Sequence, residues 1–479
     1  MNYRMILWLL GWLLLIEAAF LLLPLLVAVC YGEQSGLWFL VTLAAAGALG
    51  FVITRFKPKK RAMYAREGFV ITALGWIILS VVGSMPFWIS GQIPHYVDAL
   101  FETVSGFTTT GSTILTDVEA LDRCMNLWRC LTHWLGGMGI LVFMLAVVNL
   151  GGGQSNHLLR AESPGPTVSK MLPNMRKSSA MLYGIYIALT LILMLFLLAG
   201  GMPLYDTICT AFGTAGTGGF GIRGDSLGGY STYIQSVVAV FMLLFGVNFN
   251  VYYFLIMRKF ATAFRNTEVW VYLGIIAVST VTIGINILHL MPGWQDALHH
   301  AFFTVCSLIT TAGYATVNFE LWPEFSRIVF VLLILVGACA GSTGGGFKVA
   351  RVVILAKAAA SEIRRLLHPR SVKVLTMDGK QISQETVRGV MGYSVIYVAV
   401  IIVSLLLVSL DNFDTTTTLT AVLTTVNNVG PGLNLVGPMG SFAIFSDLSK
   451  IVMTLTMLFG RLELFPMLIL LMPSTWRKH

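Results

Sequence analysis

Apolar residues occupy much of this chain in runs of about 20 residues, and short polar segments separate the runs. A helix of about 20 apolar residues is long enough to cross the hydrocarbon core of a bilayer. The sequence therefore predicts an all-α polytopic membrane protein. The clearest spanning runs are Met5–Val29, Leu37–Ile53, Phe69–Ile89, Met181–Leu198, Val269–Leu290, Val390–Leu410 and Ile451–Met472.

A shorter pattern recurs four times between these runs. Each copy is a segment able to form a half-length helix, followed by a turn centred on glycine. Successive copies are roughly a hundred residues apart, which is typical of an internal repeat. The turns read Thr109-Thr110-Gly111-Ser112-Thr113, Thr217-Gly218-Gly219-Phe220, Thr311-Ala312-Gly313-Tyr314 and Asn428-Val429-Gly430-Pro431.

The four half-helices share a start signal. We expect them to run over about His95–Phe107 and to begin near Leu204, at Trp294 and near Phe413. Aspartate is a favoured N-cap, because its carboxylate accepts hydrogen bonds from free backbone N–H groups and complements the positive end of the helix. The opposite, partially negative helix ends would then point toward the turns. The predicted caps are Asp98, Asp206, Asp296 and Asp414.

Four glycine turns in one membrane chain indicate four walls around one narrow pore. A dehydrated cation needs a ring of oxygens, and backbone carbonyls supply it where the chain can turn them inward. Glycine permits such conformations because it has no Cβ. The predicted ring contains Thr109, Thr110, Gly111, Thr217, Gly218, Gly219, Thr311, Ala312, Gly313, Asn428, Val429 and Gly430.

The second and fourth turns depart from the simple Thr-x-Gly pattern. In the second turn Gly216 competes with Gly219 for the central position, and we prefer Gly219 because Gly219-Phe220 matches Gly313-Tyr314. Only three turns approximate the Thr-x-Gly pattern. Asn428 replaces threonine in the fourth, so the ring cannot have true fourfold symmetry.

Composition and charge agree with a membrane protein and suggest its orientation. Hydrophobic residues make up 56% of the chain and charged residues 11%, and the mean hydropathy is +0.80. The net charge of +9 is concentrated in segments away from the turns. By the positive-inside rule these segments and both termini are cytoplasmic. They include residues 55–66, 160–177, 258–265, 351–388 and 477–478.

The sequence shows little evidence for metal sites, catalytic sites or cofactor-binding motifs. The six cysteines have no metal-site spacing, although Cys124 and Cys130 could pair if they face an oxidising compartment. No segment resembles a nucleophile–base arrangement or a dinucleotide-binding fingerprint. We therefore expect no enzyme activity and no organic cofactor.

The chain divides into a leader and four units of one plan: a spanning helix, a half-helix, a turn and a second spanning helix. The first apolar run is too long for a signal peptide, so we interpret it as a retained helix. The predicted boundaries are 1–66 for the two-helix leader, 67–155 for repeat 1, 176–265 for repeat 2, 266–367 for repeat 3, 368–388 for a cytoplasmic linker and 389–479 for repeat 4.

Several motifs are specific in combination. They are Phe101-Glu102-Thr103-Val104-Ser105-Gly106-Phe107-Thr108-Thr109-Thr110-Gly111, Thr132-His133-Trp134-Leu135-Gly136-Gly137-Met138-Gly139, Arg160-Ala161-Glu162-Ser163-Pro164-Gly165-Pro166, Gly341-Ser342-Thr343-Gly344-Gly345 and Phe459-Gly460-Arg461. With these motifs the chain resembles the Trk/Ktr/HKT superfamily of potassium transporters over nearly its full length. The extra N-terminal helices favour its TrkH branch.

The resemblance implies four pore repeats around a pseudo-fourfold axis, K⁺ as the transported ion and location in a bacterial inner membrane. It also implies a homodimer and docking of a TrkA-like nucleotide-binding regulator on the cytoplasmic face. For the basic stretch Ser361–Arg388, contact with the inner leaflet is the simpler alternative. For the function, an ion-coupled K⁺ symporter that uses H⁺ or Na⁺ remains the alternative to a conducting pore.

A glycine-rich run interrupts the second helix of the third repeat. Close packing of helices through small residues explains such a run equally well, and the order Gly346-Phe347-Lys348 does not fit a phosphate-binding loop. The family resemblance makes the run an intramembrane gate. The predicted gating residues are Gly341, Ser342, Thr343, Gly344, Gly345, Gly346, Lys348 and Arg461.

Arg461 is expected in the middle of a spanning helix, where a charge is costly and usually faces a pore or a partner group. Snorkelling of its side chain to an interface is the alternative. We interpret Arg461 as facing the cavity, where it could anchor the loop carbonyls or repel cations.

Overall fold

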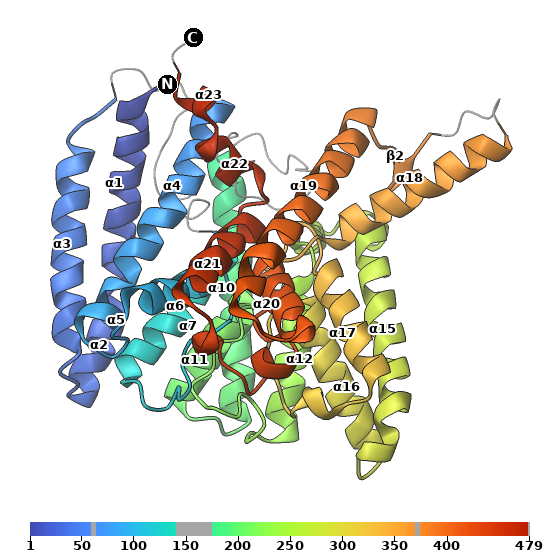
Figure 1. The fold of residues 1–479 in the computed structure, drawn as a ribbon, viewed down its shortest axis with the longest axis horizontal. Coiled ribbons are helices and arrows are strands. Elements are labelled where there is room, and N and C mark those ends of the chain that lie inside the picture. The colour runs from blue at the N-terminus through green and yellow to red at the C-terminus, as the bar shows by residue number, and fades with distance from the viewer. Residues whose placement is uncertain (59–63, 140–174, 369–373, 478–479) are drawn as a thin grey trace.

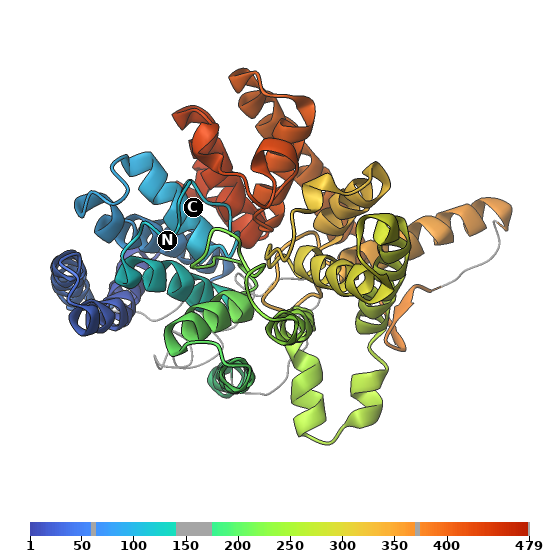
Figure 2. The ribbon, with the colours of Figure 1, turned by 90° about the horizontal axis from the view of Figure 1, so that it is seen from below.

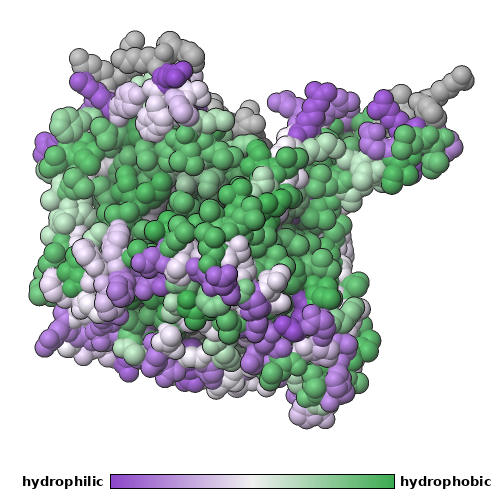
Figure 3. All heavy atoms as spheres, viewed as in Figure 1, coloured by the Kyte–Doolittle hydropathy of each residue, from purple (hydrophilic) through white to green (hydrophobic). Residues whose placement is uncertain are grey.

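The computed structural model describes residues 1–58, 64–139, 175–368 and 374–477, and almost all ordered segments in it are helices. Within these described residues, six helical stretches are long and apolar enough to cross a membrane. On the face seen in Figure 3, a belt of hydrophobic residues separates polar residues at the two ends of the molecule. These observations confirm an all-α polytopic membrane protein. The stretches are Tyr3–Tyr31, Gly36–Thr54, Arg66–Ile89, Ser179–Ala199, Thr267–Leu290 and Gln384–Asp411.

The leader helices lie at one side of the molecule (Figure 1). They are α1 (Tyr3–Phe20), α2 (Leu22–Tyr31) and α3 (Gly36–Thr54). Glycine lets α1 and α3 approach closely, since a Cβ on Gly50 would lie 2.9 Å from the carbonyl oxygen of Gly11. Small residues at such crossings are typical of membrane helices.

The remaining helices form four units that surround one axis, as Figure 2 shows. Unit one contains α4 (Ala65–Gly83), α5 (Met85–Ile89), α6 (Tyr96–Phe107) and α7 (Arg123–Gly137); unit two contains α10 (Met175–Ala199), α11 (Leu204–Gly216), α12 (Thr232–Gly246), α13 (Phe249–Ile256) and α14 (Phe260–Phe264); unit three contains α15 (Thr267–Ile287), α16 (Trp294–Ile309), α17 (Glu324–Val336) and α18 (Val349–Leu367); unit four contains α19 (Gln384–Val408), α20 (Thr415–Asn427), α21 (Asp447–Arg461), α22 (Phe465–Leu471) and α23 (Pro473–Trp476).

The half-helices are α6, α11, α16 and α20, and each begins within two residues of its predicted start. Their predicted caps are only partly correct. Asp414 is the N-cap of α20 and accepts hydrogen bonds from the Thr417 N–H at 3.0 Å and the Thr417 hydroxyl at 2.6 Å. These two bonds hold the pKa of Asp414 below its ordinary value.

The other three aspartates lie in the first turn of their helices, one turn later than predicted. The N-caps there are His95, Pro203 and Gly293. A carboxylate in the first turn still complements the helix dipole. Asp98 also forms an ion pair with Lys450 at 2.6 Å, which joins α6 to α21.

The second helices of the units differ most from the prediction. The stretch Ile451–Met472 is not one helix, because α21 ends at Arg461 and α22 starts at Phe465, with Glu463 and Leu464 at positive φ between them. In unit two, α12 and α13 are bent by 89°. In unit three, α17 already ends at Val336. In unit one, α7 ends at Gly137, and the part of the predicted second helix after residue 139 lies outside the described residues.

A small hairpin follows α18, within the segment predicted as linker 368–388. Its strands are β1 (Thr376–Met377) and β2 (Lys380–Gln381), which pair antiparallel. The hairpin lies toward the same end of the molecule as both termini (Figure 1). We call this end the terminal face.

Short 3₁₀ turns complete the fold at Leu288–Leu290, Phe319–Leu321, Ser409–Asp411, Asn434–Val436 and Phe442–Ile444. The predicted motif 160–166 and the basic residues Lys59, Lys60, Arg61, Arg370 and Lys373 lie outside the described residues.

Candidate functional site

The four glycine turns share one unusual backbone conformation. In each turn the first residue and the glycine two positions later have positive φ. Positive φ is strained for β-branched residues, and three of the four first residues are threonines. The φ pairs are 55° and 83° for Thr109 and Gly111, 53° and 79° for Thr217 and Gly219, 62° and 77° for Thr311 and Gly313, and 55° and 97° for Asn428 and Gly430.

The turns contact one another in a closed cycle. A Cβ on Gly111 would overlap the carbonyl oxygen of Gly218, and one on Gly219 would overlap that of Ala312. The third turn meets the fourth in the same way.

The cycle closes where the fourth turn meets the first: a Cβ on Gly430 would lie 2.8 Å from the carbonyl oxygen of Thr110. Each glycine thus lies against the carbonyl that precedes the central glycine of the next turn. The result is a ring of backbone, and alanine would disrupt it at each of the four positions.

This ring also decides the register of the second turn. Gly219 has the positive φ and the neighbouring-turn contact that the other central glycines have. Gly216 is the last residue of α11 and packs against the carbonyl of His133 instead.

The fourth turn uses its asparagine side chain to join two units. The Asn428 amide donates to the Thr110 hydroxyl at 2.9 Å and to the Met457 carbonyl at 3.0 Å. Asparagine tolerates the left-handed conformation better than a β-branched residue does. The fourth turn thus departs from fourfold symmetry, as expected from the sequence, because its asparagine forms side-chain hydrogen bonds to Thr110 and Met457.

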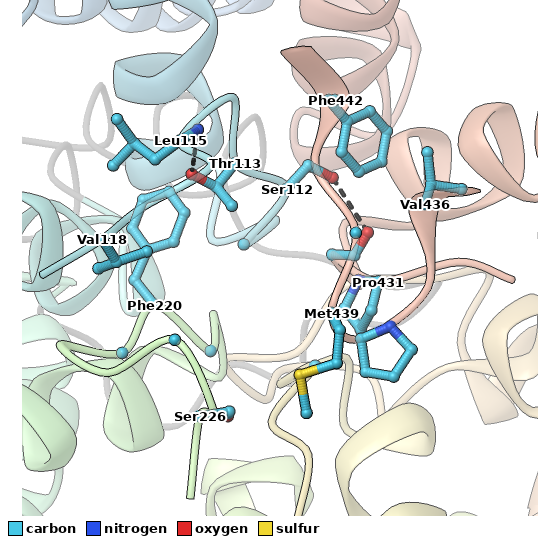
Figure 4. A pocket seen from close by; sticks show the side chains of 18 of the residues that line it. Ser112, Thr113, Leu115, Val118, Phe220, Ser226, Pro431, Val436, Met439 and Phe442 are labelled. Carbon is cyan, nitrogen blue, oxygen red and sulfur yellow. Dashed lines mark hydrogen bonds between the residues drawn. The ribbon is translucent and has the colours of Figure 1, made fainter. Parts of the chain in front are cut away.

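A pocket opens on one side of the ring, and all four central glycines line it. Figure 4 shows the turns converging around it, with Phe220, Pro431 and Met439 at its wall. The Ser112 hydroxyl donates to the Gly430 carbonyl at 3.1 Å across the first and fourth units. We call this side the mouth side of the ring.

An ion pair is buried behind the mouth. Arg129 Nε donates to Glu102 Oε1 at 2.8 Å, and both side chains are almost completely buried. Glu102 also accepts from the Ile114 N–H at 3.0 Å, and Arg129 donates to the Gly221 carbonyl at 3.2 Å. The pair thus connects the segments that follow the first and second turns.

The glycine-rich run of unit three lies on the opposite side of the ring. It is an irregular loop between α17 and α18, with Gly337, Gly341, Gly346 and Lys348 at positive φ. Its backbone is held by α12, because the Cys339 N–H donates to the Gly246 carbonyl at 3.1 Å. We call residues 337–348 the intramembrane loop.

The intramembrane loop touches the ring directly. The Gly345 N–H donates to the Thr311 hydroxyl at 2.7 Å, and the Thr217 hydroxyl donates to the Thr343 hydroxyl at 3.3 Å. A Cβ on Gly345 would overlap the carbonyl of Asn427. The loop therefore contacts the second, third and fourth turns at their loop-side ends.

Arg461 completes this arrangement from unit four. Its guanidinium donates to the Thr343 carbonyl at 2.8 Å, to the Thr109 hydroxyl at 3.2 Å and to the Gly137 carbonyl at 2.7 Å. As the last residue of α21 it is not in the middle of a helix, but it does face the centre rather than an interface. The arginine bridges the loop and the first turn.

Two more cations lie at the end of the loop. The Lys348 ammonium donates to the Gly344 carbonyl, which folds the loop back on itself. Arg351 pairs with Glu463, in the break between α21 and α22, and stacks over the Tyr393 ring at 3.8 Å. A cluster of charged side chains thus lies next to the C-terminal end of the loop.

The sequence missed some of these contacts. Glu102 belongs to a motif that we quoted, but its pairing with Arg129 was not predicted. The available signal was a carboxylate in the middle of a half-helix that we expected within the membrane. The possible Cys124–Cys130 disulfide is wrong, since all six cysteines are free thiols.

Comparison with known proteins agrees with this architecture. The TrkH family model, described as a cation transport protein, matches residues 37–478. The crystal structure of the potassium transporter TrkH from Vibrio parahaemolyticus superposes with a TM-score of 0.89 at 32% identity, with 100% of both chains covered. This chain belongs to the TrkH family.

Two relatives indicate how far the similarity extends. The Trk system potassium uptake protein TrkH of Salmonella typhimurium is 34% identical over 490 residues, with 100% of both chains covered. The protein TrkG of Escherichia coli is 31% identical, with 99% of both chains covered. The family is one of transporters rather than enzymes, which confirms the expectation from the sequence.

The Glu102–Arg129 pair generates a stability prediction. Arg129→Met leaves a buried carboxylate without its cation, and breaking a buried pair from one side typically costs about 3–5 kcal/mol. We expect a clear decrease in the midpoint of thermal unfolding in detergent. The double variant Glu102→Gln/Arg129→Met should recover part of the loss, and equal decreases in single and double variants would contradict the coupling.

Proposed function

We propose that this chain is the K⁺-conducting subunit of a bacterial K⁺ uptake system, with the glycine ring as its selectivity filter. The observation that carries the proposal is the closed cycle of glycine and carbonyl contacts between the four turns. Backbone carbonyls held in such a ring can replace the hydration shell of a cation. The full-length relatives named as potassium uptake proteins support K⁺ as the ion.

We propose further that the intramembrane loop and Arg461 close the pore beneath the filter. The loop contacts the second, third and fourth turns, and Arg461 links it to the first turn. A fixed positive charge on the path of a cation raises its electrostatic barrier, and a loop of small residues can move with few side-chain contacts to break. Lys348 takes part by stabilising the folded-back loop.

The proposal includes location and partners. The terminal face is cytoplasmic, and the mouth opens outward, as the positive-inside rule predicts. The Trk system names of the relatives support a system of more than one component. We assign a TrkA-like nucleotide-binding regulator to the terminal face, and expect the chain to form a homodimer in the inner membrane.

The alternative function is ion-coupled K⁺ symport. Secondary transporters typically bind substrate between inverted repeats at the middle of the membrane. The four units here repeat in one orientation around a shared axis, which favours a common pore.

Flux measurements test the function. Proteoliposomes containing the chain should take up ⁸⁶Rb⁺, and unlabelled K⁺ should compete more strongly than Na⁺. In planar bilayers the current should reverse near the K⁺ equilibrium potential. A reversal potential that depends on a second ion gradient would favour symport, and no ⁸⁶Rb⁺ uptake by correctly inserted protein would reject both functions.

Substitution of a ring glycine tests the filter. Gly111→Ser introduces a Cβ where the Gly218 carbonyl lies, so we expect the carbonyl ring to distort and relative Na⁺ permeation to rise severalfold. Gly274→Ser is the matched control, because a Cβ there meets open space and the residue does not line the pocket. An unchanged K⁺/Na⁺ permeability ratio in Gly111→Ser would count strongly against this residue as part of the filter.

Two variants test the gate. Deletion within Gly341–Gly346 and Arg461→Ala should each raise ⁸⁶Rb⁺ flux per inserted protein and reduce its dependence on the regulator. Arg327→Ala, which removes ion pairs with Glu320 and Glu324 away from the loop, is the control and should leave flux unchanged. If the deletion variant keeps the parental flux and its dependence on the regulator, the loop is not a gate and serves only in helix packing.

A further inference from the structure

The segments on both sides of the glycine run Gly341–Gly346 donate hydrogen bonds to a single carboxylate oxygen. Glu268 Oε1 accepts from the Ala340 N–H at 2.5 Å and from the Ala350 N–H at 3.1 Å. Ala340 precedes the glycine run, and Ala350 lies in the first turn of α18, where backbone N–H groups have no partner within the helix. The Glu268 side chain is only 3% exposed.

Capping of its own helix does not explain Glu268. The residue lies in the first turn of α15, where a carboxylate is favoured by the helix dipole. The cap of α15 is Asn266, however, whose side chain accepts from the Val269 N–H at 3.1 Å. The Glu268 carboxylate is directed to another segment of the chain.

The residue next to Glu268 is bound to the β1–β2 hairpin. The Thr267 N–H donates to Asp378 Oδ1 at 2.7 Å, and the Asp378 N–H donates to the Thr267 hydroxyl at 3.4 Å. Asp378 and Gly379 have φ of 54° and 75° and form the tight two-residue turn of the hairpin. The turn is therefore connected to the start of α15 by two hydrogen bonds.

The hairpin also contacts the helix that leaves the loop. The Lys357 ammonium, on α18, donates to the Thr376 carbonyl at 2.7 Å. The hairpin is thus attached both to α15, which carries Glu268, and to α18, which carries Ala350. It is exposed at the terminal face, where a soluble partner can reach it.

We propose that Glu268 is a positioning residue that pins the chain on both sides of the glycine run Gly341–Gly346, and that the hairpin controls this pin through Asp378 and Thr267. The inference rests on the proposed function of the loop as the gate. A displacement of the hairpin shifts Thr267, and with it the adjacent Glu268. Because one oxygen accepts both bonds, a shift of that atom weakens both hydrogen bonds together.

Cys339 provides a reporter of loop position that is independent of flux. It precedes Ala340 in the loop and is completely buried. In a background with the other five cysteines replaced, the rate of modification of Cys339 by a small thiol reagent measures how often the loop leaves its place. The parent in proteoliposomes should react slowly.

Substitutions at Glu268 test the pin. Glu268→Ala removes both hydrogen bonds and should raise the rate of Cys339 modification at least about tenfold. Glu268→Gln should stay near the parental rate, because the amide oxygen can still accept both bonds. Parental labelling in the Ala variant would overturn the pin, and equally fast labelling in both variants would show that charge rather than hydrogen bonding holds the loop.

The hairpin is tested at an exposed position, where misfolding is a small risk. Asp378→Ala should raise Cys339 labelling severalfold, whereas Lys380→Ala, an exposed change in the same hairpin, should not. Parental labelling in Asp378→Ala would overturn control by the hairpin. If labelling rises in Glu268→Ala while ⁸⁶Rb⁺ flux stays parental, the pin stands and the proposed gate fails.

Discussion

The whole arrangement depends on the absence of a Cβ at four points. Each central glycine lies against a carbonyl of the next turn, so the ring closes only if no side chain intervenes. This contact defines the position of the four turns. The half-helices, the buried Glu102–Arg129 pair and the intramembrane loop then stabilise the turns in that position. Because one chain contributes all four turns, the turns can differ in sequence, as the fourth does at Asn428. Each turn must still keep its central glycine in contact with the carbonyl of the next turn.

The strained threonines connect the ring to what lies beneath it. Positive φ at a β-branched residue persists only where surrounding contacts fix it. The Thr109 hydroxyl contacts Arg461, that of Thr217 contacts Thr343, and that of Thr311 contacts Gly345. Loop and ring are therefore not separate parts in this structure, and a change in one alters the hydrogen bonding of the other.

The sequence predicted the repeated parts well, because half-helix and glycine turn recur with local signals. It failed for the second helices, since apolar residues lie on both sides of the breaks near Gly246 and Arg461, and the few polar residues at each break do not by themselves indicate a bend. The partners of Glu268 could not be predicted, because a carboxylate in a first helical turn already has a sufficient local explanation. The Asp378-Gly379 pair was a usable hairpin signal, but only tertiary structure reveals its contact with Thr267.

The broken end of α12 has a consequence for water. Its last carbonyls, of Phe245 and Gly246, lack partners within the helix and accept hydrogen bonds from Thr343 and Cys339 of the loop. If the loop leaves, these oxygens require other donors, and inside a membrane protein only water in the cavity can supply them. Displacement of the loop and entry of water would then occur together, because water must hydrate the carbonyls at the end of α12 as the loop moves away.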